Sequence, residues 1–167
     1  MVCHPSFAAA QVSVPPAASQ NPSPMVDATR AHERLAPKEL AGTTRSFVGP
    51  AGKLVELFVP NHARSDDAFD LVVHFHGAAW IPEQAVAMLG GSTVAAVMNI
   101  GTGSGAYHNA FADTAAFDSL LAGVTREISA AIGRGAMIGR VTLVGFSAGH
   151  GAVRAILREP RYFARVS

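Results

Sequence analysis

A serine lies between two glycines in the segment Gly145-Phe146-Ser147-Ala148-Gly149. A serine hydroxyl becomes an effective nucleophile when it is exposed, aligned with a base and faced by donors for the developing oxyanion. A sharp turn from a buried strand into a helix supplies the exposure and strains the serine backbone. Residues two before and two after the serine must then be small, as Gly145 and Gly149 are. The pattern predicts covalent catalysis through Ser147.

The segments on either side of this serine fit a strand, a turn and a helix. Val141–Gly145 is an apolar run typical of a buried strand, and Ala148–Glu159 has its apolar residues on one helical side. Two glycines around a serine also occur by chance, so the pentapeptide alone is a weak signal. Its position between a strand and a helix makes it more specific. The alternative interpretation is a glycine-rich connection with an incidental serine.

A second pair of interest, His76-Gly77, ends the apolar run Leu71–His76. The chain thus has an early hairpin, a strand ending in His-Gly, a strand–helix–strand unit and a strand ending in G-x-S-x-G. This order resembles the α/β-hydrolase superfamily of serine hydrolases. The resemblance covers residues 43–167 and implies a partial α/β-hydrolase fold. In that fold, a mostly parallel sheet has helices on both faces and an antiparallel N-terminal hairpin.

The resemblance also assigns roles to residues beside the serine. In the superfamily, the residues after His-Gly and after the serine donate backbone N–H groups to the oxyanion. Here these residues are Ala78 and Ala148. His76 and Gly77 support the loop that contains Ala78, which we call the donor loop. Donors on a tight turn and at a helix N-terminus are preorganised for negative charge. The implied substrate is a small-molecule ester, thioester or amide that acylates Ser147, with no cofactor.

The acid and base of a catalytic triad do not follow the serine in the usual order of Ser, then Asp or Glu, then His. After Ser147 the only carboxylate is Glu159 and the only histidine is His150. His150 lies in the first turn of the expected helix, so its ring is tied to that turn and poorly placed as a base. We therefore expect an incomplete hydrolase domain that lacks its C-terminal strands and has negligible turnover by itself. The full-length form would be the active enzyme.

The remaining expected elements alternate between strands and helices, which predicts a parallel sheet covered on both faces. The Gly49-Pro50-Ala51-Gly52 turn predicts a hairpin between two of these strands. In chain order we expect strands at Thr43–Val48 and Lys53–Val59, a polar loop at Asn61–Asp67, a helix at Pro82–Leu89, a strand at Val94–Ile100, a helix over about Asp113–Ile132, and the approach to another strand at Tyr162–Ser167.

The folded domain is predicted to span residues 42–167, after a disordered or export-related tail at residues 1–41. Gln11–Pro24 is rich in Pro, Ala and Ser, as many disordered tails are, and a short helix is expected at Val26–Leu35. Phe7–Ala10 resembles the small-residue end of a signal peptide, but a basic n-region and an uninterrupted apolar region are missing. Export and a cytoplasmic location both stay open.

The composition excludes several classes of function. The chain is 49% hydrophobic with a mean hydropathy of +0.25, yet no stretch approaches 18 uninterrupted apolar residues. Buried parallel strands therefore explain the apolar content better than a membrane span. The net charge is +1 and the basic residues are scattered, which argues against nucleic-acid binding. Cys3 is the only cysteine, and no Cys/His cluster has zinc-ligand spacing.

Two other patterns suggest different chemistry. His74 and His76 lie on one face of a strand, but no third metal ligand is near in the sequence, so structural roles are favoured over metal binding. The segment Gly101–Ala106 loosely fits the dinucleotide-binding G-x-G-x-x-A pattern. It does not follow the first strand of its unit, no helix is expected for several residues, and no acidic residue ends a strand about 20 residues on. A loop bordering the pocket is the favoured interpretation.

The lining of the substrate pocket is expected from the loops that follow the strands. Trp80, Tyr107 and His108 fall in such loops, where open α/β sheets bind ligands. Two alternatives to a serine hydrolase stay open at this point. One is a non-catalytic hydrolase-like binding protein that has kept the serine turn, and the other is a nucleotide-binding oxidoreductase that uses Gly101–Gly105.

Overall fold

The computed structural model describes residues 36–65 and 68–166. The chain divides into two units, Met1–Arg34 and Leu35–Ser167, and all described residues belong to the second. The predicted helix at Val26–Leu35 and the signal-like segment at Phe7–Ala10 lie outside the described residues.

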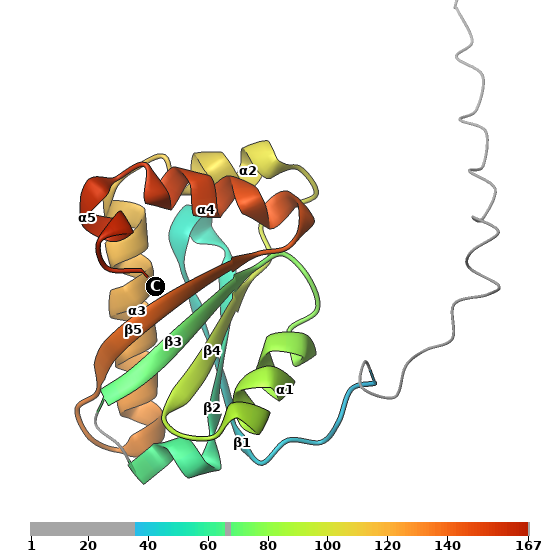
Figure 1. Cartoon of the computed structure of the whole chain (residues 1–167), viewed down its shortest axis with the longest axis vertical. Helices are drawn as coiled ribbons and strands as arrows, with labels where there is room; N and C mark the ends of the chain where they lie inside the picture. Colours follow the sequence, from blue (N-terminus) through green and yellow to red (C-terminus); the bar gives the residue numbers. More distant parts are fainter. Residues whose placement is uncertain (1–35, 66–67, 167) are drawn as a thin grey trace, which may run out of the picture. The chain divides into compact units, whose positions relative to one another are not determined.

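Five strands form one mixed sheet in the order β1-β2-β4-β3-β5 (Figure 1). β2 pairs antiparallel with both β1 and β4, and β3 pairs parallel with β4 and β5. Among the described strands, β2 is therefore the only one that runs in the reverse direction. This arrangement confirms the α/β class and the N-terminal hairpin. The strands are β1 (Gly42–Val48), β2 (Leu54–Pro60), β3 (Ala68–Phe75), β4 (Thr93–Met98) and β5 (Met137–Gly145).

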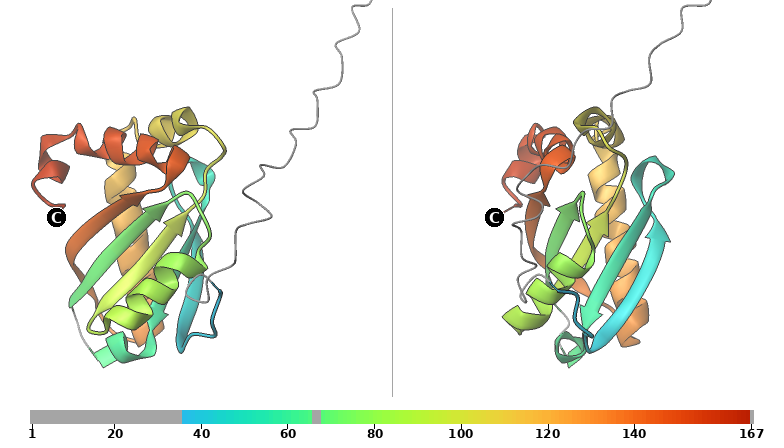
Figure 2. Two further views of the ribbon diagram at one scale, coloured as in Figure 1. Left: turned by 45° about the vertical axis from the view of Figure 1, so that its right-hand side comes forward. Right: turned by 90° about the vertical axis from the view of Figure 1, so that its right-hand side faces the viewer.

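Helices lie on both faces of this sheet. α1 contacts β4, β2 and β3, whereas α3 contacts β1, β2 and β5, and Figure 2 shows the two helices on opposite sides. α2, α4 and α5 lie at the carboxyl ends of the parallel strands (Figure 1). The helices are α1 (Trp80–Leu89), α2 (Ser104–Ala110), α3 (Ala115–Ile132), α4 (His150–Leu157) and α5 (Pro160–Phe163), with short 3-10 turns η2 (Pro50–Gly52), η3 (Asn61–Ser65) and η4 (Ser147–Gly149).

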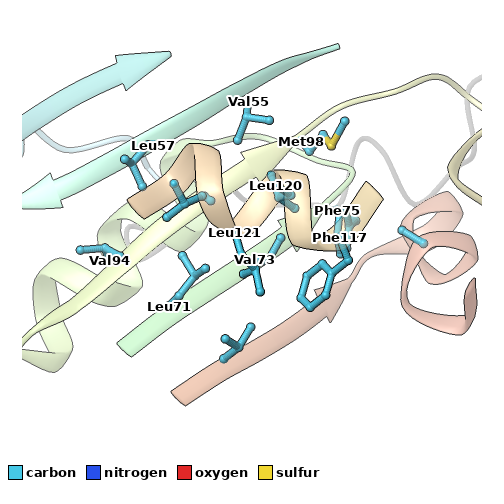
Figure 3. Close-up of a cluster of buried hydrophobic side chains, with 14 of the residues drawn as sticks. Val55, Leu57, Leu71, Val73, Phe75, Val94, Met98, Phe117, Leu120 and Leu121 are labelled. Carbon is cyan, nitrogen blue, oxygen red and sulfur yellow. The ribbon is translucent and has the colours of Figure 1, made fainter. Parts of the chain in front are cut away.

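Two apolar layers hold the helices to the sheet because successive strand residues point to opposite faces. In β4, Val94 and Ala96 belong to the main core, whereas Ala95 packs with Phe58 and Val86 in the smaller layer that includes α1. α3 closes the main core with residues at helical spacing (Figure 3). The most buried members of this core include Val55, Leu57, Leu71, Val73, Phe75, Met98, Phe117, Leu120, Val124 and Ile128.

An ion pair fixes the start of β5 against β3. Arg140 donates its backbone N–H to Asp70 Oδ1 at 3.1 Å, and its Nε and Nη2 donate to Oδ2 at 3.1 and 2.5 Å. The guanidinium beside Asp70 holds the pKa of that carboxyl below its usual range. The β3–β5 register shifts between Phe69 and Leu71, so the pair lies at the irregularity. Regular β3–β5 pairing resumes just beyond it, at Leu71 and Val141.

Three sequence predictions need correction. α2 begins at Ser104, so the expectation that no helix starts soon after Gly101 is wrong; a seven-residue helix with Tyr107 as its buried residue carries too little periodicity to be seen. Residues 61–65 of the predicted polar loop form η3. Within Tyr162–Ser167 the chain is first helical in α5, and then Val166 makes an isolated parallel bridge to Val141.

None of the helices within residues 36–65 and 68–166 combines the length and the apolar character needed to cross a membrane.

α2 packs directly on the backbone of α4. A Cβ atom on Gly151 of α4 would lie 2.0 Å from the carbonyl oxygen of Ser104, the first residue of α2. Real Cβ atoms do not approach so closely, so Gly151 is the residue that allows the two helices to meet.

This contact predicts that Gly151→Ala destabilises the fold although alanine is the better helix former by about 1 kcal/mol. We expect a net loss of about 1–3 kcal/mol in the free energy of unfolding, since backbone atoms must move apart. Urea unfolding followed by circular dichroism measures this loss. Gly105→Ala, inside α2 with no atom within 4 Å of the added Cβ, is the matched control and should not destabilise. Equal stability of the Gly151 variant and the parent would contradict the contact.

Candidate active site

Ser147 occupies a strained turn at the carboxyl end of β5. Its φ of 44° lies in the left-handed region, and its side chain is exposed. Two backbone hydrogen bonds hold the turn: Phe146 N–H donates to Phe75 O at 3.0 Å, and Gly149 N–H donates to Phe146 O at 2.8 Å. β5, η4 and α4 follow one another here as the strand, turn and helix that the sequence predicts.

The two glycines of the turn are required by close backbone contacts. A Cβ on Gly149 would lie 1.9 Å from Phe75 O, and one on Gly145 would lie 2.9 Å from His150 N. The first contact is with the end of β3, and the second is with the first residue of α4. Glycine at both positions therefore lets the serine turn close against the neighbouring strand.

The loop between β3 and α1 lies beside this turn and is also strained. His76 has a φ of 70° and Gly77 a φ of 129°. The side-chain amide of Asn99 clamps the loop: Gly77 N–H donates to Asn99 Oδ1 at 2.9 Å, and Asn99 Nδ2 donates to Gly77 O at 3.0 Å. Among the described residues, the N–H of Ala78 has no hydrogen-bond partner. The clamp thus leaves an exposed, unpaired donor one residue after Gly77.

The ring of His76 connects the loop to the serine turn. Its Nδ1 lies 2.9 Å from the hydroxyl of Tyr107, which also accepts a hydrogen bond from Ile100 N–H at 3.0 Å. The other side of the ring stacks on Phe146, with centroids 6.3 Å apart and planes at 12°. Phe146 immediately precedes Ser147, so α2, the donor loop and the serine turn share one network of contacts.

Two other histidines, His74 and His150, donate hydrogen bonds to backbone carbonyls. His74 is buried beneath the loop, and its Nε2–H donates to His76 O at 3.0 Å. Burial lowers the pKa of the His74 imidazole below its ordinary value of 6.5. The Nδ1–H of His150 donates to Ser147 O at 2.7 Å, which ties this ring to the turn.

The predicted pocket residues occupy different places. Trp80 is the first residue of α1 and is half-buried. Tyr107 is fully buried with its hydroxyl bonded to His76, so it supports the loop and does not line a pocket, which corrects its predicted place. His108 is half-buried and lines a hollow between α2 and α4. In residues 36–65 and 68–166, no three His, Cys, Asp or Glu side chains come together to hold a metal ion.

Asn99 is the site residue that sequence reasoning missed. A signal was available, because Asn99 directly follows β4, and β4 is the parallel neighbour of β3. The carboxyl ends of adjacent parallel strands meet at one edge, so a polar residue there lies near the loop after β3.

No protein-family model matches this chain, and no curated protein sequence matches it. What the site does must therefore be inferred from its geometry.

We predict that the Tyr107 hydroxyl contributes measurably to the free energy of unfolding. Tyr107→Phe keeps the buried ring but removes the partner of Ile100 N–H and His76 Nδ1, so we expect a loss of about 1–3 kcal/mol in the free energy of unfolding. Urea unfolding provides the measurement, and the shift of the Ile100 amide proton in NMR spectra reports the lost bond directly. If the free energies of unfolding of the variant and the parent agree within about 0.3 kcal/mol and the Ile100 amide does not shift, the hydrogen bonds of the hydroxyl do not stabilise the fold.

We predict that the protein loses stability on acidification because of His74. Because its pKa is lower in the folded protein, the unfolded chain binds the proton more readily, and stability falls as the pH drops below about 6.5. Urea unfolding at pH 7.5 and 5.5 compares the parent with His74→Gln, whose amide can still donate to His76 O. The variant should lose less stability between the two pH values. Equal losses would assign the acid sensitivity to other groups.

Proposed function

We propose that this chain carries the nucleophile and the oxyanion donors of an α/β-hydrolase-type serine hydrolase, which cleaves an ester, thioester or amide through an acyl-enzyme on Ser147. The observation that carries the proposal is that one residue organises both parts of the site. Phe75 accepts the hydrogen bond of the serine turn and is followed directly by the loop that contains Ala78. The nucleophile and the donor loop are thus held at one edge of the sheet.

In the proposed reaction, Ser147 Oγ attacks the acyl carbon and loses its proton to a base. The carbonyl electron pair moves to oxygen, and the N–H groups of Ala78 and Ala148 donate to this oxyanion. Ala148 lies in η4, where the first N–H groups have no partner within the helix and favour negative charge. The leaving alcohol, thiol or amine takes up a proton as the tetrahedral intermediate collapses. Water then attacks the acyl-serine and releases the acid.

The proposal leaves the general base and its acid unassigned. The Nδ1 of His150 is bonded to Ser147 O, so its ring is held by the backbone of the turn rather than by a carboxylate. Glu159 lies beyond the end of α4, 3.9 Å from Arg161. Neither residue has the serine–histidine–carboxylate arrangement of a triad. We therefore expect slow acylation by this chain, driven by the oxyanion donors and the exposed position of Ser147.

Among the residues that the structure describes, no base and acid are aligned on Ser147, and this observation favours a second candidate function. A binding protein with this fold could keep the serine turn for its shape, with Ser147 unreactive. The reactivity of Ser147 toward an electrophile separates the two functions, because only a site with working oxyanion donors activates the serine.

A fluorophosphonate probe tests the proposal on the full chain. The serine oxygen displaces fluoride, and the oxyanion donors accelerate this step even without a triad base. Catalytic sites without one triad member retain on the order of 10³-fold acceleration over water. We expect Ser147 to label at least about tenfold faster than any other serine, as measured by intact mass and peptide mapping.

Ser147→Ala should abolish this fast labelling. Ser46→Ala, at an exposed position of β1, is the matched control and should label like the parent. If Ser147→Ala labels as strongly as the parent, Ser147 is not the nucleophile, and the binding-protein function is favoured.

A further inference from the structure

A hollow of about 250 Å³ lies between α2 and α4. α2 contributes Ser104, Gly105 and His108, α4 contributes His150, Gly151 and Arg154, and Arg158 follows the end of α4. We call it the α2–α4 hollow. Gly151, which also lines the hollow, lets α4 come directly against the Ser104 carbonyl.

Four of the residues that line the α2–α4 hollow are basic types, His108, His150, Arg154 and Arg158, and no carboxylate of the described residues lines it. His150, Arg154 and Arg158 are spaced four residues apart and therefore form one stripe along α4 and its end. Within the part of the chain that the structure describes, Arg154 and Arg158 have no ion-pair partner, whereas Arg45, Arg126, Arg140 and Arg161 each contact a carboxylate.

Two unneutralised guanidinium groups four residues apart repel each other at a helix surface. An anion between them would remove this cost. Guanidinium groups also match the geometry of carboxylate and phosphate oxygens, to which they donate two parallel hydrogen bonds. Ser104, which lines the hollow from α2, carries a hydroxyl that can donate to an anion.

The α2–α4 hollow is connected to the serine turn through His150. His150, which lines it, donates to the carbonyl of Ser147 at 2.7 Å. At about 1.5 Å per residue, Arg154 lies about 6 Å further along the helix than His150. Arg154 follows Ser147 by seven residues, so its backbone lies on the order of 10 Å from the serine turn, and a group bound by its long side chain would lie several bonds from the serine.

We propose that the α2–α4 hollow binds an anionic group, a carboxylate or a phosphate, of the substrate that acylates Ser147. Anion binding by the hollow does not depend on the proposed function, whereas the substrate assignment rests on it. The expected substrate is an ester, thioester or amide that carries a negative charge several bonds away from the reacting carbonyl.

Anion binding is tested first, without any activity. Inorganic phosphate and succinate are titrated separately into the full chain at constant ionic strength, and NMR follows the amides of Ser104, Gly105 and Gly151. At least one anion should shift these amides, and the stronger binder tells whether phosphate or carboxylate is preferred. Arg154→Gln should weaken binding at least about tenfold.

Arg165→Gln is the matched control, because it removes the same charge from an exposed position outside the hollow. It should change the affinity less than about twofold. If it weakens binding as much as Arg154→Gln, only the net charge matters and the site is refuted. A parent chain that binds neither phosphate nor succinate refutes it as well.

The assignment of an anionic substrate is tested with two esters of equal chain length, mono-p-nitrophenyl adipate and p-nitrophenyl hexanoate. Intact mass measures the rate at which each acylates Ser147 in the full chain. The parent should prefer the charged ester, and Arg154→Gln should reduce this preference about tenfold, whereas Arg165→Gln should keep it.

The two proposals fail in different ways. If neither ester acylates Ser147 while anions still bind beside Arg154, the hydrolase function is wrong and the anion site stands. If Ser147 is acylated with no preference for the charged ester, the hydrolase function stands and the assignment of an anionic substrate is wrong.

Discussion

The carbonyl oxygen of Phe75 sets how near the serine turn comes to the central strand. It accepts the N–H of Phe146 and sits where a side chain on Gly149 would be, so the turn closes against β3 without any atom between the two backbones. Left-handed backbone at a non-glycine residue costs of order 1–3 kcal/mol and persists only when its surroundings enforce it. Ser147 meets this condition, because the strand behind it and the helix after it are both held to the core.

The donor loop depends on the same edge of the sheet. β4 places Asn99 beside the loop, where a single amide satisfies both backbone groups of Gly77. α2 places the Tyr107 hydroxyl against His76, whose ring reaches Phe146. The loop after β3 and the stretch from Asn99 to Tyr107, both distant from Ser147 in the sequence, therefore support the few residues around it. Such support matters because a catalytic donor that is free to move loses its advantage over water.

The sequence predicted the elements that carry strong local patterns. The apolar runs of the strands, the turn at residues 49–52 and the long amphipathic α3 are visible in composition and periodicity, and the structure has all of them. The glycines at 145 and 149 could be explained in advance because the strained turn demands small neighbours. α2 could not be predicted, since its stability comes from Tyr107 and from α4 rather than from its own seven residues. The role of Tyr107 depends on how α2 packs against the loop after β3, and a sequence pattern does not contain this packing.

The pairing of β3 with β5 has a consequence for how the protein folds. These strands are separated by α1, β4, α2 and α3, so their contact closes a long stretch of chain and incurs its loop entropy before any hydrogen bond forms. The serine turn can take its strained shape only after β5 has docked beside Phe75. Local structure in α3 and the β1–β2 hairpin can form without that step. The geometry around Ser147 thus requires the long-range topology of the sheet to be complete.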